Sequence, residues 1–288
     1  MGLLLQYTLL YASVLFLVAL GGALAMQWFA ELGPVIMVAA VLLGSILFGM
    51  LYSLLLALAA INFSADQTLI GTAMNLLGTA AATVFVKAIN MAQNPDNVSS
   101  AIRYIEQKKA LSVSVAGFEL SLFMLLSLCA LLLANFLLDR TSFGLRLMAC
   151  GENPQAAASV GIDVCKMRYA GVLISGALGG LGGIAFITAG VSEWKFENGV
   201  AGFGFLALAV MIFGQWKPKW IALSALLFGF LRALSNVYTS FAFLTAWNLP
   251  GSFYNMLPYI ICLLVLVYAS ANSRAPKAEG IPYDKGQR

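Results

Sequence analysis

The sequence predicts an all-α membrane protein, a polytopic bundle of about eight transmembrane helices. Hydrophobic residues make up 61% of the 288 positions, and charged residues make up only 10%. A soluble domain carries about 25% charged residues, so this chain has too few of them to cover a water-facing surface. The chain also contains a series of apolar runs, most of them near the roughly 20 residues that a membrane-crossing helix needs.

The apolar runs define the expected spans in order along the chain. Seven candidates are residues 3–25, 35–61, 68–89, 118–138, 169–188, 220–238 and 256–269. We expect the first to be a retained helix, because no basic segment precedes it as in a signal peptide. An eighth run, 203–214, is too short to cross upright, and we expect either a short span in thinned membrane or half of a broken helix. The predicted parts are a transmembrane domain, 1–271, and a tail, 272–288.

Lys and Arg in the connections predict the orientation of these spans. The segment 139–168 holds four of them, and the connection 215–220 and the tail after residue 271 are also basic. We expect all three in the cytoplasm, together with both termini. Alternation then places 191–202 and 90–117 outside, although 90–117 is itself basic, because long loops contribute weakly to orientation.

Several kinds of chemistry are not expected. The chain has no histidine, which excludes Ser-His-Asp catalysis, His-ligated metals and His proton relays. Its four cysteines are dispersed and form no C-x-x-C pair, so small apolar filler is the favoured role for each. A phosphate-binding G-x-x-x-x-G-K-[ST] loop is also lacking. We therefore expect no catalytic residue, metal, cofactor or nucleic-acid partner.

A glycine-rich stretch, residues 175–186, is the first candidate functional feature. Gly176, Gly179 and Gly183 share one face of a helix. Small residues let helix backbones approach closely in lipid, where packing drives association. Tight helix packing is the favoured interpretation, and a moving or pathway-lining interface is the alternative.

A polar stripe is the second feature. Gln67 begins it, and Thr68, Thr72, Asn75 and Thr79 continue it at helical spacing. Polar groups are costly in hydrocarbon, so such a stripe faces either a partner helix or a water-filled path. The residues favour the two alternatives equally. Because the stripe itself is uncharged, it fits a neutral polar cargo better than an ion.

The third feature lies in the predicted cytoplasmic segment. Residues 152–160 are expected to form a short amphipathic helix, with Pro154 in its first turn and Gly161 at its end. A compact helix between two spans is either a docking element for a partner or an ordinary connector.

The same segment carries a resemblance to a known family. From Thr141 to Ile162 it reads T-x-x-G-x-R-x-x-A-x-G-E-N-P-x-A-A-x-x-x-G-I. This run resembles the signature loop of bacterial ABC-transporter permeases of the branched-chain amino acid and ribose type. Residues 65–75, 202–218 and 275–286 are similar to the nucleoside-importing branch, which works with lipoproteins of the basic-membrane-protein kind.

The N-terminal region departs from this family. Members follow the first helix with a segment of the form E-R-x-G-x-x-N-x-G-x-E-G. Here Gly21 and Gly22 run straight into 23–27, and that segment is absent. If the family segment lines the pathway, its absence bears on transport and on the N-terminal topology.

The resemblance implies a transport subunit rather than an enzyme, located in the bacterial cytoplasmic membrane. The implied mechanism is alternating access, in which a lipoprotein delivers a nucleoside to a pair of permease subunits. Separate ATPase subunits would drive the cycle through the cytoplasmic loop, and the second permease would be a related chain. The implied coupling residues are Arg146, Gly151, Glu152, Asn153, Pro154, Ala157 and Gly161.

Five residues are candidates for contact with the cargo. Gln67 and Asn75 carry amides that offer both a donor and an acceptor to a nucleobase edge, and Thr72 lies on the same stripe. Phe203 and Phe205 offer aromatic faces on which a base can stack. Ordinary packing in the bundle is the alternative for each.

Other functions remain open from the sequence. Within the same class, sugar or branched-chain amino acid cargo is the near alternative. An ion-coupled secondary transporter needs ionisable residues inside the membrane, whereas Asp66 and Glu119 lie near the starts of predicted helices. A membrane subunit without a transport path is the remaining alternative.

Overall fold

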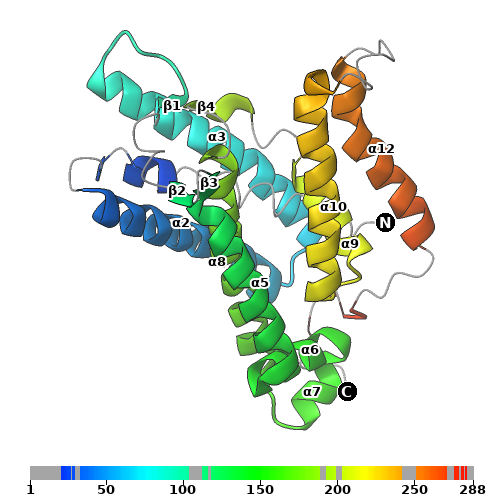
Figure 1. Ribbon diagram of the computed structural model, residues 1–288. Coiled ribbons are helices and arrows are strands. Elements are labelled where there is room, and N and C mark those ends of the chain that lie inside the picture. The colour runs from blue at the N-terminus through cyan, green and yellow to red at the C-terminus, as the bar shows by residue number, and fades with distance from the viewer. Residues whose placement is uncertain are drawn as a thin grey trace. The chain divides into compact units, whose positions relative to one another are not determined.

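The computed structural model is dominated by helices (Figure 1). It describes residues 21–26, 28–29, 33–103, 112–115, 118–188, 193–198, 203–241, 251–270, 276–278, 280–281 and 283. Most of the expected first span, 3–25, lies outside the described residues. The chain forms two compact units, one of Met1–Ala201 with Lys277–Arg288 and the other of Gly202–Pro276. Each is described by itself.

The first unit holds most of the labelled elements. Its helices are α2 (Pro34–Ala57) with its π-helical continuation η2 (Leu58–Asn62), α3 (Gln67–Gln93), α5 (Leu122–Arg140), α6 (Ser142–Glu152), α7 (Pro154–Ser159) and α8 (Val164–Thr188). Its short strands are β1 (Ala101–Arg103), β2 (Ser112–Val115), β3 (Phe118–Ser121) and β4 (Glu193–Lys195), followed by the 3-10 turn η4 (Phe196–Asn198). The second unit holds α9 (Phe203–Phe213), α10 (Pro218–Val237), the turn η5 (Tyr238–Ser240) and α12 (Gly251–Ser270).

Five helices among the described residues are long and apolar enough to cross a membrane. They are Pro34–Asn62, Leu69–Gln93, Leu122–Arg140, Val164–Thr188 and Pro218–Ser240. The prediction of a multi-pass helical membrane protein is thereby confirmed, and the figure of about eight spans is not. The short run expected at 203–214 is indeed a helix, α9, of 11 residues.

The expected span 118–138 begins four residues too early. Phe118–Ser121 is strand β3, which pairs in antiparallel register with β2, and α5 starts only at Leu122. Two of the paired positions are Val113 with Leu120 and Val115 with Phe118. These apolar side chains raise the hydropathy of the segment, while their alternation with Ser and Glu is the period of a strand.

Helices α2 and α8 make the most extensive helix contact of the described elements. A Cβ atom added at Gly176 would lie 2.6 Å from the carbonyl oxygen of Gly49 and 2.5 Å from Cβ of Ser53. The two backbones therefore approach so closely that only glycine fits at position 176. This pair of helices forms the centre of the first unit.

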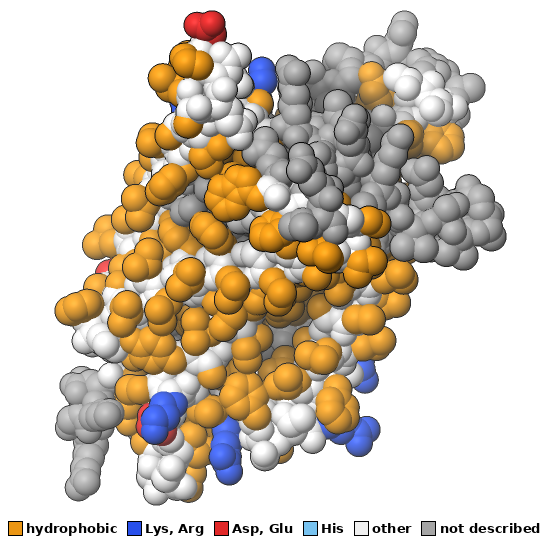
Figure 2. All heavy atoms as spheres, turned by 90° about the vertical axis from the view of Figure 1, so that its left-hand side faces the viewer, with side chains coloured by type: hydrophobic (Ala, Val, Ile, Leu, Met, Phe, Trp, Pro, Cys, Tyr) orange, Lys and Arg blue, Asp and Glu red, His pale blue; other side chains and the backbone are white. Residues whose placement is uncertain are grey.

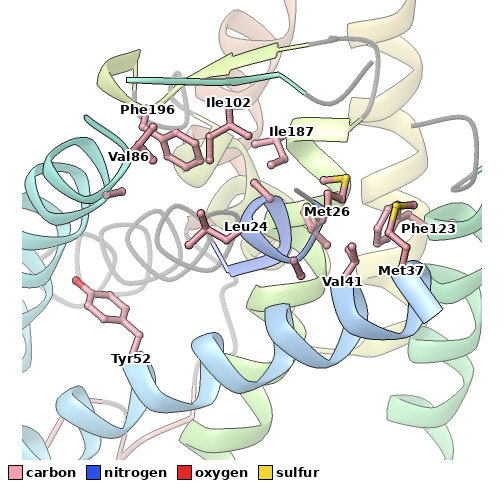
Figure 3. Packing of buried hydrophobic residues seen from close by; sticks show 14 of the residues in the cluster. Leu24, Met26, Met37, Val41, Tyr52, Val86, Ile102, Phe123, Ile187 and Phe196 are labelled. Atoms are coloured by element: carbon pink, nitrogen blue, oxygen red, sulfur yellow. The ribbon is translucent and has the colours of Figure 1, made fainter. Parts of the chain in front are cut away.

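A small two-stranded sheet lies at one end of the first unit. Strands β1 and β4 pair, with Ile102 opposite Trp194, and Phe196 beside them is fully buried. In Figure 3, Phe196, Ile102 and Val86 lie together beside these strands. The pairing brings the connection after α3 and the connection after α8 to the same end of the unit.

One face of the first unit is largely apolar (Figure 2). Figure 2 shows hydrophobic side chains covering most of one face, with few charged groups among them. On α5 the exposed side chains include Leu128, Leu132, Leu133 and Phe136, each about three-fifths exposed. A patch of this extent is unfavourable in water. It is the surface expected of a helix that faces lipid.

Candidate coupling and pathway sites

The sharp turn from α5 into α6 depends on two residues of the signature run. Thr141 caps α6, because its side-chain oxygen accepts a hydrogen bond from the Gly144 amide at 3.1 Å. A Cβ added at Gly144 would lie only 2.6 Å from Cα of Leu138. Glycine is therefore required where α6 folds back against the end of α5.

Helix α7 has defined caps at both ends. The Asn153 side-chain oxygen accepts a hydrogen bond from the Ala156 amide at 3.0 Å, and Pro154 follows in the first turn. At the other end Gly161 has φ +84°, and its amide donates to the Ala158 carbonyl at 3.0 Å. The predicted helix-ending role of Gly161 is confirmed.

The expected start of this helix is wrong by two residues. Glu152 is the last residue of α6, and α7 begins at Pro154. Asn153 between them is extended, with φ −148° and ψ 93°, because the residue before a proline avoids the helical region. The loop thus holds two helices joined by one residue, not one helix of 152–160.

Three polar residues among the predicted coupling residues are exposed at the surface of this loop. Arg146, Glu152 and Asn153 are exposed, and among the described residues neither charged side chain has an ion-pair partner. Apolar side chains are exposed nearby, among them Met148 and Val160. A surface with available charges and exposed apolar groups fits a protein partner.

A small core holds the loop together from within. Cys150, Ala157 and Val164 are buried against one another, so one residue from each of α6, α7 and α8 meets there. Burial raises the pKa of the Cys150 thiol, and the positive charge of Arg168 opposes that shift. The thiol is therefore protonated at neutral pH.

Sequence reasoning missed Arg168 as part of this site. Its guanidinium Nη1 donates to the carbonyl of Ile281 at 3.0 Å, across 113 residues of sequence. No local periodicity links positions so far apart. The only signal was that the run 275–286 belongs to the family resemblance.

The predicted polar stripe lies beside the buried face of α3. Gln67 and Asn75 are half-buried and Thr72 is exposed, while the side chain of Thr68 lies outside the described part. The Thr79 hydroxyl donates to the Asn75 carbonyl at 3.1 Å, within the helix. The stripe positions therefore remain at or near the surface of the unit.

The buried face of α3 is formed by other residues. They are Gly71, Met74, Gly78, Ala82, Val86 and Asn90. The hydroxyl of Tyr52 on α2 donates to the Met74 carbonyl, which joins the two helices. Packing within the unit uses this face and leaves the amide of Asn75 at its margin.

The remaining predicted residues fall on other elements. Phe203 and Phe205 lie in the first turn of α9, in the second unit, and their side chains lie outside the described residues. On α8, Gly176, Gly179 and Gly183 are buried, whereas Gly182 is exposed. Among the described residues, no group of three acidic or thiol side chains is placed to hold a metal ion.

Comparison with known proteins identifies relatives over most of the chain. Residues 12–266 match the family described as the permease component of branched-chain amino acid transport systems. The chain is 38% identical to the nucleoside ABC transporter permease protein NupC of Lactococcus lactis, over 84% of this chain and 76% of the relative. It is 36% identical to the guanosine ABC transporter permease protein NupQ of Bacillus subtilis, over 86% of this chain and 78% of the relative. No solved structure matches significantly.

Proposed function

This chain belongs to the family of permease components of branched-chain amino acid transport systems, and from that premise we propose that it carries nucleosides inward as a subunit of an ABC importer. The assignment of nucleosides as cargo rests on the similarity to two permeases named for nucleoside and guanosine transport. A permease subunit makes and breaks no covalent bond. Its task is to open a path first to one side of the membrane and then to the other.

We place the ATPase contact on α6 and α7. These short helices connect the ends of α5 and α8 (Figure 1), so a push on α7 reaches both spans directly. The caps at Asn153 and Gly161 keep α7 a compact body. Arg146 and Glu152 offer one charge of each sign for charge-assisted contacts that fix the docking register.

The orientation follows from the same assignment. With α6 and α7 in the cytoplasm, the paired strands β1 and β4 lie outside, near the point where a lipoprotein would deliver cargo. That pairing favours placing 90–117 and 191–202 on one side, as alternation requires. The proposal includes about eight spans in 1–271, a cytoplasmic tail 272–288, both termini inside, and a second, related permease subunit.

The cargo path is proposed to run along the polar stripe of α3. Asn75, Gln67 and Thr72 border the buried face and present amide and hydroxyl groups at its margin. An amide can both donate to and accept from a nucleobase edge. In the second unit, Phe203 and Phe205 are proposed separately as residues on which a base can stack.

Uptake of labelled guanosine tests the cargo assignment. Cells that contain this chain, its ATPase, its second permease and its lipoprotein should accumulate the label. Excess unlabelled nucleosides should compete, and ribose or leucine should not. Competition by ribose or leucine at the same excess would instead assign a sugar or amino acid cargo.

Substitution of Asn75 tests the path. Asn75→Leu should lower uptake about tenfold, since a buried polar contact with a ligand contributes roughly 1.5 kcal/mol. Asn75→Gln keeps the amide and should retain part of the uptake. Leu76→Ala is the matched control, because Leu76 is an exposed apolar neighbour. Normal uptake by Asn75→Leu would remove this residue from the path.

A further inference from the structure

The C-terminal tail returns to the loop of α6 and α7. The amide of Ala278 donates to the carbonyl of Gly151 at 2.9 Å. Gly151 lies in the last turn of α6, where carbonyls have no amide partner within the helix. The tail thus supplies a hydrogen bond that the end of α6 lacks.

A second attachment joins the tail to α8. Arg168 donates to the Ile281 carbonyl at 3.0 Å, and its guanidinium carbon lies 5.9 Å from the centroid of the Tyr283 ring. The distance fits a cation–π contact. One arginine therefore holds the tail at two points.

The tail also covers the small core of the loop. Tyr283 packs against the cluster formed by Cys150, Ala157 and Val164. A turn shapes the approach to this position: the Ile281 amide donates to the Ala278 carbonyl at 3.3 Å, and Gly280 has φ +76°. A positive φ at the third position of such a turn favours glycine. Ala278 and Tyr283 therefore contact the region where α6, α7 and α8 meet.

We propose that the tail residues Ala278, Ile281 and Tyr283 form a clamp that fixes the ATPase-docking surface, with Arg168 as its positioning residue. Helices α6 and α7 have 11 and 6 residues, and helices shorter than about 12 residues are marginal by themselves. Their position depends on contacts from other parts of the chain. The inference rests on the proposed function, since it assigns a purpose to the surface on which the ATPase would dock.

The thiol of Cys150 provides a direct probe of the clamp. It is only 3% exposed, in the cluster that Tyr283 covers. In the assembled transporter, with Cys129, Cys165 and Cys262 replaced by alanine, labelling of Cys150 by a maleimide reports whether the cover is in place. Tyr283→Ala and Arg168→Gln should each accelerate labelling about tenfold, the result of losing roughly 1.4 kcal/mol of local protection.

Two variants are matched controls. Lys166→Gln removes a positive charge two residues from Arg168, but Lys166 is exposed and forms its ion pair with Asp163, at 3.2 Å, not with the tail residues that the structure describes. Tyr283→Phe keeps the ring that packs on the core and faces the guanidinium. Both should label at the rate of the unmodified chain. The clamp would be overturned if Tyr283→Ala were labelled as slowly as the unmodified chain, or if Tyr283→Phe were labelled as fast as Tyr283→Ala.

Retention of the ATPase during purification tests the purpose of the clamp. Tyr283→Ala and Arg168→Gln should lose several-fold more ATPase than Lys166→Gln, at equal yield of monodisperse permease. Full retention in both would overturn the inference. The variant Arg146→Glu separates the two proposals: if it alone loses the ATPase, the docking assignment stands and the clamp fails, and if it too retains the ATPase, the docking assignment itself fails.

Discussion

Helices α5 and α8 lead into and out of the same loop, yet they pack differently. α5 holds nine leucines and no glycine, and α8 holds six glycines. In the most apolar stretch of α5, 6% of the residues are buried, whereas in that of α8 33% are buried. α5 is nevertheless the more apolar of the two helices. In a membrane, apolar character does not select which helix packs, because lipid is as apolar as leucine. The helix that packs is instead the one with small residues, because these let two backbones approach closely.

The loop of α6 and α7 is therefore joined to one tightly packed helix, α8, and to one loosely packed helix, α5. α8 is joined to α2 through Gly176, and α5 contacts few other described helices. Movement of α7 would therefore pass to the centre of the unit through α8, while α5 is available to lipid or to a second permease. Substitutions in the two helices test this comparison.

The largest expected effect is at the glycine face of α8. Gly176→Leu would force a side chain against the Gly49 carbonyl, and overpacking of this kind costs about 3 kcal/mol or more. We expect the purified protein to aggregate or to lose much of its thermal stability. Gly182→Leu makes the same change at an exposed position of the same helix and should be tolerated. Equal behaviour of the two variants would contradict the assigned face.

A smaller effect is expected within α5. Phe123 is 6% exposed near the first turn of α5 and belongs to the central cluster (Figure 3), whereas Leu132 is 59% exposed. Phe123→Ala should cost about 3 kcal/mol of stability. Leu132→Ala should stay within about 0.5 kcal/mol. Thermal unfolding in detergent measures both, and a comparable loss in the two variants would show that α5 packs along its whole length.

The smallest effect is expected at the ion pair that joins α3 to the turn η4. Lys87 and Glu197 form an ion pair at 2.7 Å, and both side chains are partly exposed. The hydrogen bond and charge of Lys87 lower the pKa of Glu197 below its ordinary value. The pair therefore stabilises the fold above that ordinary value, and the contribution is lost as the pH falls through the lowered pKa.

Glu197→Gln isolates this contribution. The variant should unfold at a slightly lower temperature than the unmodified chain at neutral pH, and the difference should shrink in acid and at high salt. A difference that persists unchanged in acid would mean that the side chain acts through packing and not through its charge.

Much of the fold can be predicted from hydropathy. The predictions that fail do so for specific physical reasons. Hydropathy alone predicts one helix over 118–138, because Phe118 and Leu120 are apolar, although both belong to strand β3. The pattern over 152–160 predicts that Glu152 belongs to the same helix as Pro154, but Asn153, before the proline, is extended and Glu152 ends α6. Helical spacing found that Gly176, Gly179 and Gly183 share a face, and the structure buries all three.

The site residues were less predictable than the helices. Periodicity places Asn75 on a polar stripe, but it cannot tell a path from the margin of a packed interface. The contacts of Arg168 with Ile281 and Tyr283 join distant segments that carry no shared pattern. Such contacts depend on how α6, α7 and α8 fold back together, which no local signal encodes.

Transport by the reconstituted complex tests the central claim most directly. Vesicles that contain this chain with its partner subunits, with ATP inside and guanosine and the lipoprotein outside, should accumulate guanosine. Glu152→Lys reverses an exposed charge on the proposed docking surface and should abolish both accumulation and nucleoside-stimulated ATP hydrolysis, while the permease remains folded. Accumulation without ATP, or equal accumulation by Glu152→Lys, would contradict coupling through this loop.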